Sequence, residues 1–315
     1  MSYVHSPVLL SQVLANLVGE RDKLFLDCTL GEGGHSEAVL QNFSNISVIG
    51  LDRDTEILAV ARDRMSAFQG RFAGLNVNFA DVTADDILAS PLGSLYSQNG
   101  GFDSILVDLG ISVFHYKISQ KGFSFGVEQP LDMRLSSVGM SAADIINTWT
   151  EKQLLEMLYR YAEEKHAKLI VRRILEKRAL SPITTTKQLA DIIAAAIPKK
   201  FHTKIHPATK TFQALRIAVN NEFDNIERGI PNLMKLLKVG GRMGVITFHS
   251  LEDRIVKNIF AEMYKDCVCP PTAPICTCHK RREINYIVKH AEPDEEEVKR
   301  NSPSRSAKIR IVEKL

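Results

Sequence analysis

Three glycines and one aspartate are the first residues whose types and spacing could do chemistry. Gly31, Gly33 and Gly34 follow an apolar stretch in the segment LDCTLGEGGH, residues 26–35. A glycine-rich loop after a strand lets a ligand lie against the backbone. Asp52 ends the next apolar stretch, eighteen positions beyond Gly34. A carboxylate at this spacing accepts hydrogen bonds from ribose hydroxyls, so the pattern predicts a ribose-bearing cofactor.

Two further residues of the loop discriminate between cofactors. The dinucleotide pattern G-x-G-x-x-G needs its third glycine for close helix packing, and Ser36 stands at that position. Glu32 adds a negative charge, which repels a pyrophosphate but attracts a cofactor with an ammonium and a sulfonium group. The loop therefore favours S-adenosylmethionine over NAD, and an NAD-dependent oxidoreductase stays as the alternative.

Asp108 is the candidate residue for the reaction itself. It ends a fourth predicted strand, whose segment SILV is apolar throughout. Ligands of open α/β sheets bind outside the carboxyl ends of the strands, so we expect Asp108 beside the glycine loop. A cap or turn aspartate is the alternative interpretation.

The elements that must position these residues form an α/β pattern at both ends of the chain. Strands without a polar face, separated by helices, predict a parallel sheet covered on both sides. The predicted strands are 23–30, 46–52, 75–82, 102–110, 241–248, 284–290 and 307–315, and the predicted helices are 36–43, 55–68, 211–238 and 250–263. We expect Gly240 and Gly241 to cap the third of these helices and Ser250 to cap the fourth.

The middle of the chain shows helical periodicity and no convincing strand. Helices are predicted over 150–177 and 184–197. The sequence therefore predicts an α/β domain made of residues 1–114 and 212–315, with an inserted all-helical domain over 115–211.

Composition limits the class of protein. The 315 residues are 44% hydrophobic and 24% charged, with a net charge of +3, values that are ordinary for a soluble globular protein. No run of eighteen apolar residues is present, so we expect neither a transmembrane helix nor a membrane partner. The first residues lack a basic region and a cleavage site, so a cytoplasmic protein is expected. The mild basic balance permits a nucleic-acid partner.

Several long motifs together resemble one family. The sequence is similar to the bacterial 16S ribosomal RNA cytosine-N4 methyltransferases, which also occur in mitochondria, and the resemblance covers nearly the whole chain. The motifs are HSPVLL (5–10), DCTLGEGGHS (27–36), GLDRD (50–54), LVDLGIS (106–112), KGFSF (121–125), PLDMRL (130–135), HPATKTFQALRIAVNNE (206–222), ITFHSLEDRIVK (246–257) and SRSAKIR (304–310).

The resemblance implies a fold, a reaction and partners. It implies a class I, Rossmann-like methyltransferase domain with a mostly parallel sheet, and an inserted helical domain that recognises the substrate. It implies methyl transfer from S-adenosyl-L-methionine to N4 of one cytidine of 16S rRNA, giving N4-methylcytidine near the decoding site of the small ribosomal subunit. A monomer and a homodimer both stay open, and so does an RNA-binding assembly factor that keeps the fold without catalysis.

The resemblance also implies site residues. The positions that match the family's cofactor contacts are Gly33, Gly34, His35, Asp52, Val82, Asp108 and His115. Val82 stands where the family usually has an aromatic residue against adenine, and His115 stands where it usually has glutamine. His35 has two interpretations, a contact with the methionine end of the cofactor or a cap of the following helix.

The exocyclic amine of cytosine is a weak nucleophile, because the nitrogen lone pair is delocalised into the ring, so its methylation requires an activating group. A hydrogen-bond acceptor for N4–H localises that pair, and the segment DLGIS offers Asp108 and Ser112. We expect Asp108 to be the catalytic residue, contacting the cofactor and polarising the amine.

Other motifs leave alternatives open. Asp132 and Arg134 either form a salt bridge that ties the insertion to the main domain or contact substrate. His249 is a candidate site residue after the fifth predicted strand. The basic clusters 199–204, 279–282 and 299–308 are either solvated surface or phosphate contacts.

Four of the five cysteines crowd into one short segment. Cys267, Cys269, Cys276 and Cys278 could hold zinc tetrahedrally. Their C-x-C pairs are tighter than the usual C-x2–4-C spacing, and the family resembled does not require a metal. The sequence therefore favours a loop of free thiols, with no metal in the predicted site.

Overall fold

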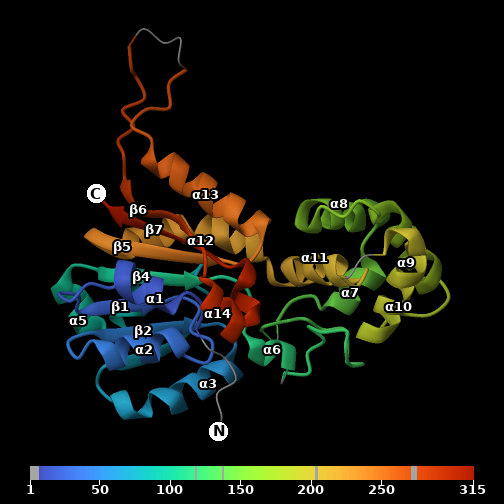
Figure 1. Cartoon of the computed structure of the whole chain (residues 1–315), viewed down its shortest axis with the longest axis horizontal. Helices are drawn as coiled ribbons and strands as arrows, with labels where there is room; N and C mark the ends of the chain where they lie inside the picture. Colours follow the sequence, from blue (N-terminus) through green and yellow to red (C-terminus); the bar gives the residue numbers. More distant parts are fainter. Residues whose placement is uncertain (1–6, 118, 137, 203–204, 271–274) are drawn as a thin grey trace. The chain divides into compact units, whose positions relative to one another are not determined.

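The computed structural model describes residues 7–117, 119–136, 138–202, 205–270 and 275–315. The chain divides into two compact units (Figure 1). Unit 1 is made of Met1–Ile111 and Phe223–Leu315, and unit 2 of Ser112–Glu222. No helix in the described part of the chain combines the length and the apolar character that crossing a membrane requires.

Unit 1 is built on a seven-stranded sheet in the order β3-β2-β1-β4-β5-β7-β6. Neighbours among the first five strands are parallel, and β7 is antiparallel to both β5 and β6. The strands are β1 (Leu24–Asp27), β2 (Ser47–Asp52), β3 (Phe72–Asn76), β4 (Phe102–Asp108), β5 (Leu237–Thr247), β6 (Ile284–Ala291) and β7 (Lys308–Lys314). This order gives a mostly parallel, Rossmann-like sheet, as the sequence predicted.

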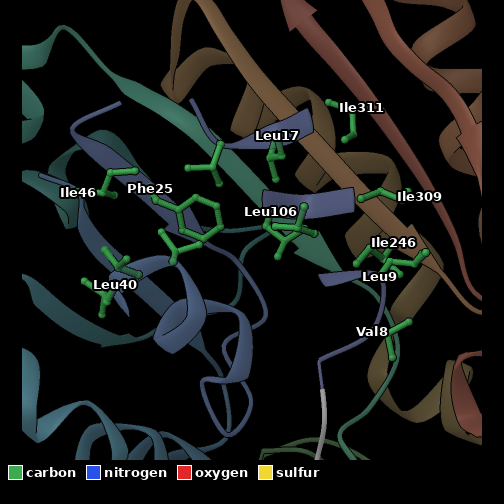
Figure 2. Close-up of a cluster of buried hydrophobic side chains, with 14 of the residues drawn as sticks. Val8, Leu9, Leu17, Phe25, Leu40, Ile46, Leu106, Ile246, Ile309 and Ile311 are labelled. Atoms are coloured by element: carbon green, nitrogen blue, oxygen red, sulfur yellow. The ribbon is translucent and has the colours of Figure 1, made fainter. Parts of the chain in front are cut away.

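Most of the helices of unit 1 carry buried apolar residues. They are α1 (Leu10–Gln12), η1 (Val13–Leu17), α2 (Gly34–Asn42), α3 (Thr55–Arg64), η2 (Met65–Phe68), α4 (Ala84–Leu88), α5 (Gly93–Asn99), α12 (Glu222–Leu236), α13 (Ser250–Tyr264), α14 (Glu295–Arg300) and η4 (Ser302–Ser306). Figure 2 shows one core cluster, in which Phe25 of β1, Leu106 of β4 and Ile309 of β7 pack with Leu17 and Leu40. All five side chains are buried, so the core fixes the strand ends that carry the site.

In the described residues of unit 2 the regular secondary structure is helical, apart from one isolated bridge between Pro130 and Thr185, and a long loop joins its first two helices. Its helices are α6 (Val113–Lys117), α7 (Ala142–Thr148), α8 (Glu151–Ala162), α9 (Ala167–Arg178), α10 (Thr186–Ala196), η3 (Lys199–Phe201) and α11 (Thr209–Asn220). Three of these helices begin at a capping box, in which a Ser or Thr side chain and the side chain three residues on satisfy each other's backbone N–H. The pairs are Ser141 with Asp144, Thr150 with Gln153 and Thr185 with Gln188.

The boundary between the units differs from the sequence prediction. The sequence placed the end of the insertion at residue 211, within what is one helix, α11. This helix packs on α7 and α8, so contacts assign it to unit 2. The start differs by a few residues, with Ser112 opening unit 2.

Four local predictions were wrong. One is the helix 211–238, which is two helices, α11 and α12, separated where Asn221 adopts a left-handed conformation. The third strand is β3 at 72–76 and not 75–82, because the backbone turns at Asn78, whose carbonyl accepts from the N–H groups of Asp81 and Val82. The predicted helix 150–177 is two helices, α8 and α9, separated where Glu163 adopts a left-handed conformation. Gly240 and Gly241 lie within β5 and do not cap a helix.

Candidate active site

The glycine loop connects β1 to α2 and approaches α3. Gly33 is the N-cap of α2, has φ +82° and donates its N–H to the carbonyl of Leu30 at 2.8 Å. A Cβ atom at this position would lie 2.9 Å from Cε of Met65. Both the left-handed backbone and the close approach require glycine. The loop therefore presents bare backbone at the start of a helix, where a ligand can approach closely.

Asp52 holds this loop at the end of β2. Its Oδ2 accepts the N–H of Gly31 at 2.9 Å, and its Oδ1 accepts the N–H of Asp54 at 2.9 Å. Asn76, at the end of β3, donates to the Asp52 carbonyl at 2.9 Å. The sequence predicted a ribose-binding acid here. The structure shows that the carboxylate also fixes the glycine loop, a role that the spacing alone did not reveal.

Three further acids lie near the carboxyl ends of the neighbouring strands. Asp27 ends β1 and accepts hydrogen bonds from Ser36 Oγ at 2.7 Å and from the N–H of Thr29 at 3.3 Å. Burial raises the pKa of Asp27 to about 6. Burial also raises the pKa of Asp108 well above its ordinary value, and the charges of Asp27 and Glu252 raise it further. The site is thus a mostly buried, electronegative cluster.

Asp108 faces His35 across this cluster. Nδ1 of His35 lies 3.7 Å from Oδ2 of Asp108, and Nε2 of His35 donates to the carbonyl of Val8 at 2.9 Å. Burial lowers the pKa of His35 to about 4, so the ring is neutral at pH 7. Oδ1 of Asp108 is buried and has no hydrogen-bond partner among the residues that the structure describes. A buried carboxylate oxygen of this kind needs a ligand group or a proton to satisfy it.

This arrangement fits a cationic cofactor. S-adenosylmethionine carries an ammonium and a sulfonium group, and either charge would offset the mutual repulsion of Asp27, Asp108 and Glu252. A pyrophosphate would add negative charge to the same cluster. The buried oxygen of Asp108 and the bare loop at Gly33 therefore fit S-adenosylmethionine and disfavour NAD.

The structure brings some of the predicted cofactor residues together and places others in different surroundings. His35 and Asp108 lie together, and Asp52 holds the loop that contains Gly33 and Gly34. Val82 is fully buried, and its carbonyl accepts a hydrogen bond from Asn232 at 2.7 Å.

His115 belongs to unit 2. It is buried there, with its ring 5.7 Å from Phe114 and 5.5 Å from Phe123, measured between centroids. Ser112 opens the same unit and accepts the N–H of Phe114 on its Oγ at 3.2 Å.

His249, and not Ser250, is the N-cap of α13. Nδ1 of His249 accepts the N–H of Glu252 at 3.4 Å, while the Glu252 carboxylate accepts the N–H of His249 at 3.3 Å and that of Phe248 at 2.9 Å. The prediction that Ser250 caps this helix was wrong, because the reciprocal capping box begins one residue earlier. Asp253, in the first turn of the same helix, forms a bidentate ion pair with Arg310 of β7 at 2.8 and 3.0 Å.

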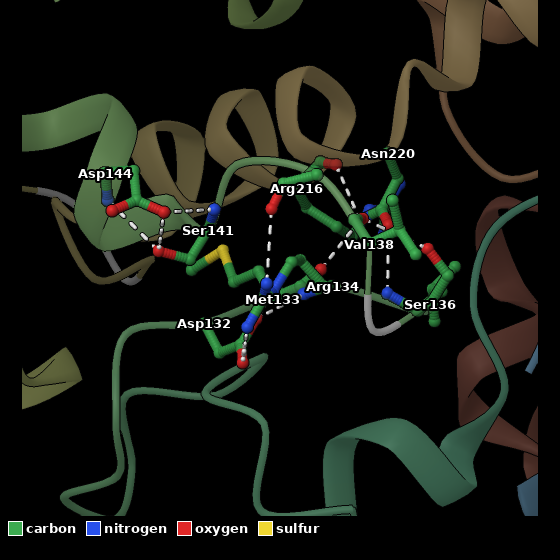
Figure 3. Close-up of polar contacts among 11 residues, drawn as sticks. Asp132, Met133, Arg134, Ser136, Val138, Ser141, Asp144, Arg216 and Asn220 are labelled. Atoms are coloured by element: carbon green, nitrogen blue, oxygen red, sulfur yellow. Dashed lines mark hydrogen bonds and ion pairs between the residues drawn. The ribbon is translucent and has the colours of Figure 1, made fainter. Parts of the chain in front are cut away.

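The Asp132–Arg134 pair is local to one loop of unit 2 (Figure 3). Nε of Arg134 lies 2.6 Å from Oδ1 of Asp132, and a second guanidinium nitrogen donates to Oδ2 at 3.0 Å. Met133 between them has φ +62°, and Asn220 of α11 donates to the Met133 carbonyl at 2.8 Å. The pair therefore forms the expected salt bridge and braces a turn within unit 2, and substrate contact stays a prediction.

Sequence reasoning missed two residues that shape the site. Thr29 Oγ1 accepts the backbone N–H of Asp108 at 2.7 Å, which joins the glycine loop to the end of β4. Glu252 is fully buried and raises the pKa of Asp108. The H-x-x-E spacing of His249 and Glu252 is a capping signal in the sequence, whereas nothing in the sequence pairs Thr29 with Asp108.

Comparison with known proteins identifies the family. A family model described as the MraW methylase family matches residues 2–315. A curated relative from Treponema denticola, named Ribosomal RNA small subunit methyltransferase H, is 44% identical over 319 residues that cover 100% of this chain and 98% of the relative. Relatives of the same name from Trichlorobacter lovleyi and Carboxydothermus hydrogenoformans are 43% and 40% identical over 317 residues, covering 99% and 100% of this chain and 98% and 99% of their own.

Solved structures add only a weak likeness. An rRNA methylase from Streptococcus thermophilus gives a TM-score of 0.40 at 10% identity, covering 100% of this chain and 99% of that chain, which is too low to support an argument. The family match over residues 2–315 and the acidic cluster at the strand ends lead to one conclusion. The chain belongs to the MraW methylase family, and it is an S-adenosylmethionine-dependent methyltransferase.

Proposed function

We propose that this protein transfers a methyl group from S-adenosylmethionine to N4 of a specific cytidine of 16S rRNA, near the decoding site of the small ribosomal subunit, in the cytoplasm. The names of the relatives support small-subunit rRNA as the substrate. The sequence motifs support the cytidine N4 and the decoding site. The observation that carries the chemistry is the buried, unpartnered Oδ1 of Asp108, described above, at the end of β4.

In this proposal the loop and the strand ends hold the cofactor. When bound, S-adenosylmethionine supplies an electrophilic methyl group on a sulfonium centre. The backbone of Gly33 and Gly34 would lie against it, and Asp52 would accept hydrogen bonds from its ribose. Further proposed contacts, carried over from the family motif, are those of His35, Val82, Asp108 and His115.

Asp108 is the proposed catalytic residue. Its carboxylate would accept a hydrogen bond from the N4–H of the target cytosine and so localise the nitrogen lone pair. The new N–C bond would form as the bond between the methyl group and the cofactor sulfur breaks, with S-adenosylhomocysteine as the leaving group. The amine then carries a positive charge and loses one proton, which Asp108 accepts. Proton transfer to a positioned group contributes about 10²- to 10⁴-fold in rate. His35, held by Val8, keeps a neutral ring beside this carboxylate.

Because the pKa of Asp108 is raised, this residue can act as a base only when something keeps its carboxyl group ionised. Without a nearby cation, burial and the charges of Asp27 and Glu252 favour the protonated acid, which cannot accept another proton. A positive charge beside Asp108 lowers its pKa and restores the carboxylate. Cofactor binding would therefore prepare the base, so that the amine is activated only when a methyl group is present.

The helical insertion, predicted over 115–211, is proposed to recognise the rRNA. One pocket is lined by Arg160 and Tyr161 of α8 and by Trp149, which precedes this helix. The Arg160 guanidinium lies 5.6 Å from the centre of the Tyr161 ring. Aromatic and guanidinium planes of this kind stack on unpaired bases. Lys199 and Lys200 are exposed on η3, where they suit phosphate contacts. Thr203 and Lys204 of that basic cluster lie outside the described residues, as do His5 and Ser6 of the first motif.

Substrate preference tests this proposal. Purified protein would be incubated with methyl-labelled cofactor and either assembled small subunits, large subunits or protein-free 16S rRNA. We expect label in 16S rRNA, with assembled small subunits preferred, because RNA is recognised largely by shape. Normal rRNA binding without any methyl transfer would instead support a non-catalytic assembly factor.

Salt dependence tests the role of the insertion. Replacing Lys199 and Lys200 by Ala should weaken small-subunit binding and lower the slope of log K against log salt by about one for each lost phosphate contact. Replacing the exposed Lys152 and Lys168 of the same unit is the matched control for the same loss of charge. Equal effects of the two double variants would leave η3 without a special role.

A further inference from the structure

Four cysteines converge in the loop that joins α13 to β6. Cys267 and Cys269 lie in the outgoing arm of this loop, and Cys276 and Cys278 in the returning arm. Figure 1 shows the loop extending away from the sheet beyond α13 and β6. The four sulfur atoms all lie within 4.8 Å of one another, although the two arms are separated along the chain. The arms therefore meet at their sulfurs.

The distances between sulfurs are those of a tetrahedral metal site. Cys267 Sγ lies 3.5 Å from that of Cys276 and 3.7 Å from that of Cys278, and Cys276 Sγ lies 4.0 Å from that of Cys269 and 3.5 Å from that of Cys278. A zinc–sulfur bond of about 2.3 Å gives a tetrahedron whose sulfurs are about 3.8 Å apart. We propose that Cys267, Cys269, Cys276 and Cys278 bind one Zn²⁺ ion as thiolates.

The same distances disfavour other fates for the thiols. A disulfide requires two sulfurs about 2.0 Å apart, and the structure shows all four cysteines as free. A multinuclear iron–sulfur cluster sits between its thiolates and spreads them further than a single ion does. A set of unrelated free thiols has no reason to direct four side chains to one point. The sequence favoured free thiols because each C-x-C pair is short, but each pair supplies one edge of the tetrahedron.

Backbone N–H groups donate hydrogen bonds to the cysteine sulfurs, as they do around metal-bound thiolates. The N–H of Val268 donates to Cys278 Sγ at 3.4 Å, and the N–H of Cys269 donates to Cys267 Sγ at 3.3 Å. Hydrogen bonds of this kind orient the ligands of a metal and offset their charge. Zinc with four thiolates keeps a net negative charge, and Lys280 and Arg281 follow Cys278 closely to balance it.

The described parts of the loop have little else to hold them together. Val268 and Ile275, its two large apolar residues there, are 53% and 76% exposed. At the base of the loop, Arg282 pairs with Asp266 at 2.6 Å and lies 4.3 Å from the centre of the Tyr264 ring. A segment without an apolar core is commonly stabilised by a metal or by disulfides. Zinc binding would keep the basic residues of the returning arm in a fixed place.

Metal content tests this inference directly and does not depend on methyl transfer. The protein would be purified under reducing conditions without chelator, and its zinc measured by mass spectrometry of the elements. We expect about one zinc per chain. Cys276→Ser and Cys278→Ser should each lose most of it. Cys28→Ala is the matched control, because Cys28 is buried in unit 1 and lies outside the cluster. Circular dichroism would establish that each variant is folded.

Two further measurements complete the test. Co²⁺ added to the metal-free protein should give the intense visible bands of a tetrahedral thiolate site, and the bands should be absent in Cys276→Ser. Trypsin should cut near Arg281 faster after zinc removal. Chains with under about a tenth of a zinc and no cobalt bands would overturn the inference. So would intact mass that shows two disulfides in protein prepared without reductant.

Discussion

Nδ1 of His35 lies 3.7 Å from Oδ2 of Asp108, and the two side chains have opposite responses to the same burial. Burial lowers the pKa of His35 to about 4 and raises that of Asp108 well above its ordinary value. Because Nε2 of His35 donates its N–H to the Val8 carbonyl, Nδ1 carries the lone pair and faces the carboxyl group. A positive charge placed beside this pair would lower the pKa of Asp108 and favour its anion.

The first prediction concerns cofactor affinity and pH. A proton on Asp108 competes with a bound cation, so affinity for S-adenosylmethionine should rise with pH, by up to about tenfold per pH unit below the pKa of Asp108. Calorimetry between pH 5.5 and 7 would measure the affinity. Binding in buffers of different ionisation heat should show proton release. Asp108→Asn should bind with a smaller dependence on pH, because Asp27 still titrates in this range and Asp108 no longer does. An equal dependence in both proteins would contradict the role of Asp108.

The second prediction concerns stability and Asp27. Its pKa is about 6 in the folded protein and near the ordinary 3.8 in the unfolded chain. The folded state therefore binds the proton more tightly, and the free energy of unfolding should fall as pH rises from about 4 to above 6. Asn at position 27 carries no charge and can still hydrogen-bond Ser36. Asp27→Asn should be more stable than the native protein at pH 8, by up to about 3 kcal/mol, and similar below pH 4.

Urea unfolding at several pH values measures this difference. Asp63→Asn is the matched control, because Asp63 is exposed on α3 in the same unit. If the free energies of unfolding of Asp27→Asn and the native protein differ by the same amount at every pH from 4 to 8, ionisation of Asp27 does not destabilise the fold and the prediction is wrong.

The fold near the site was predictable because the strands there are short apolar runs. β1, β2 and β4 are nearly all buried, and each therefore reads as a continuous apolar segment. The third strand was misplaced because its exposed edge position relaxes this pattern and the segment after it is also rich in apolar residues. Because β2 and β4 were predicted correctly, their carboxyl ends were too. Asp52 and Asp108 are the last residues of these strands and could therefore be placed from the sequence.

The remaining features depend on contacts through space. The bond between Gly31 and Asp52 joins residues 21 positions apart, and the bond between Thr29 and Asp108 joins residues 79 apart. No spacing rule in a single sequence encodes either. The cap of α13 was predicted wrongly for a different reason. Serine is preferred over histidine at helix N-caps, so residue preference alone selects Ser250. The position of Glu252, three residues after His249, decides it.

The third prediction separates the two roles of Asp52. Asp52→Ala should weaken cofactor binding because it loses the ribose contact and also releases the loop at Gly31. Binding of S-adenosylhomocysteine and of an analogue lacking a ribose hydroxyl would be measured in both proteins. If Asp52 contacts the ribose, removing the hydroxyl should cost affinity in the native protein and little in Asp52→Ala. Equal costs in both proteins would leave Asp52 with the loop role alone.

The fourth prediction concerns the cap of α13. His249→Ala should lower the free energy of unfolding by about 0.5–2 kcal/mol, the usual cost of losing an N-cap. Ser250→Ala should change it by less than about 0.5 kcal/mol, as at an ordinary surface position. Urea denaturation of the two variants compares neighbouring residues directly. A larger loss in Ser250→Ala would mean that the helix begins at the serine in solution.

The most direct measurement of the central claim identifies the methylated atom. Small ribosomal subunits that lack the modification would be incubated with the protein and S-adenosylmethionine, digested to nucleosides, and analysed by chromatography with mass detection. The native protein should produce N4-methylcytidine, and Asp108→Asn should produce it about 10²- to 10⁴-fold more slowly while remaining folded. Asp63→Asn should match the native protein. Methylation at another atom, or near-normal turnover by Asp108→Asn, would contradict the account.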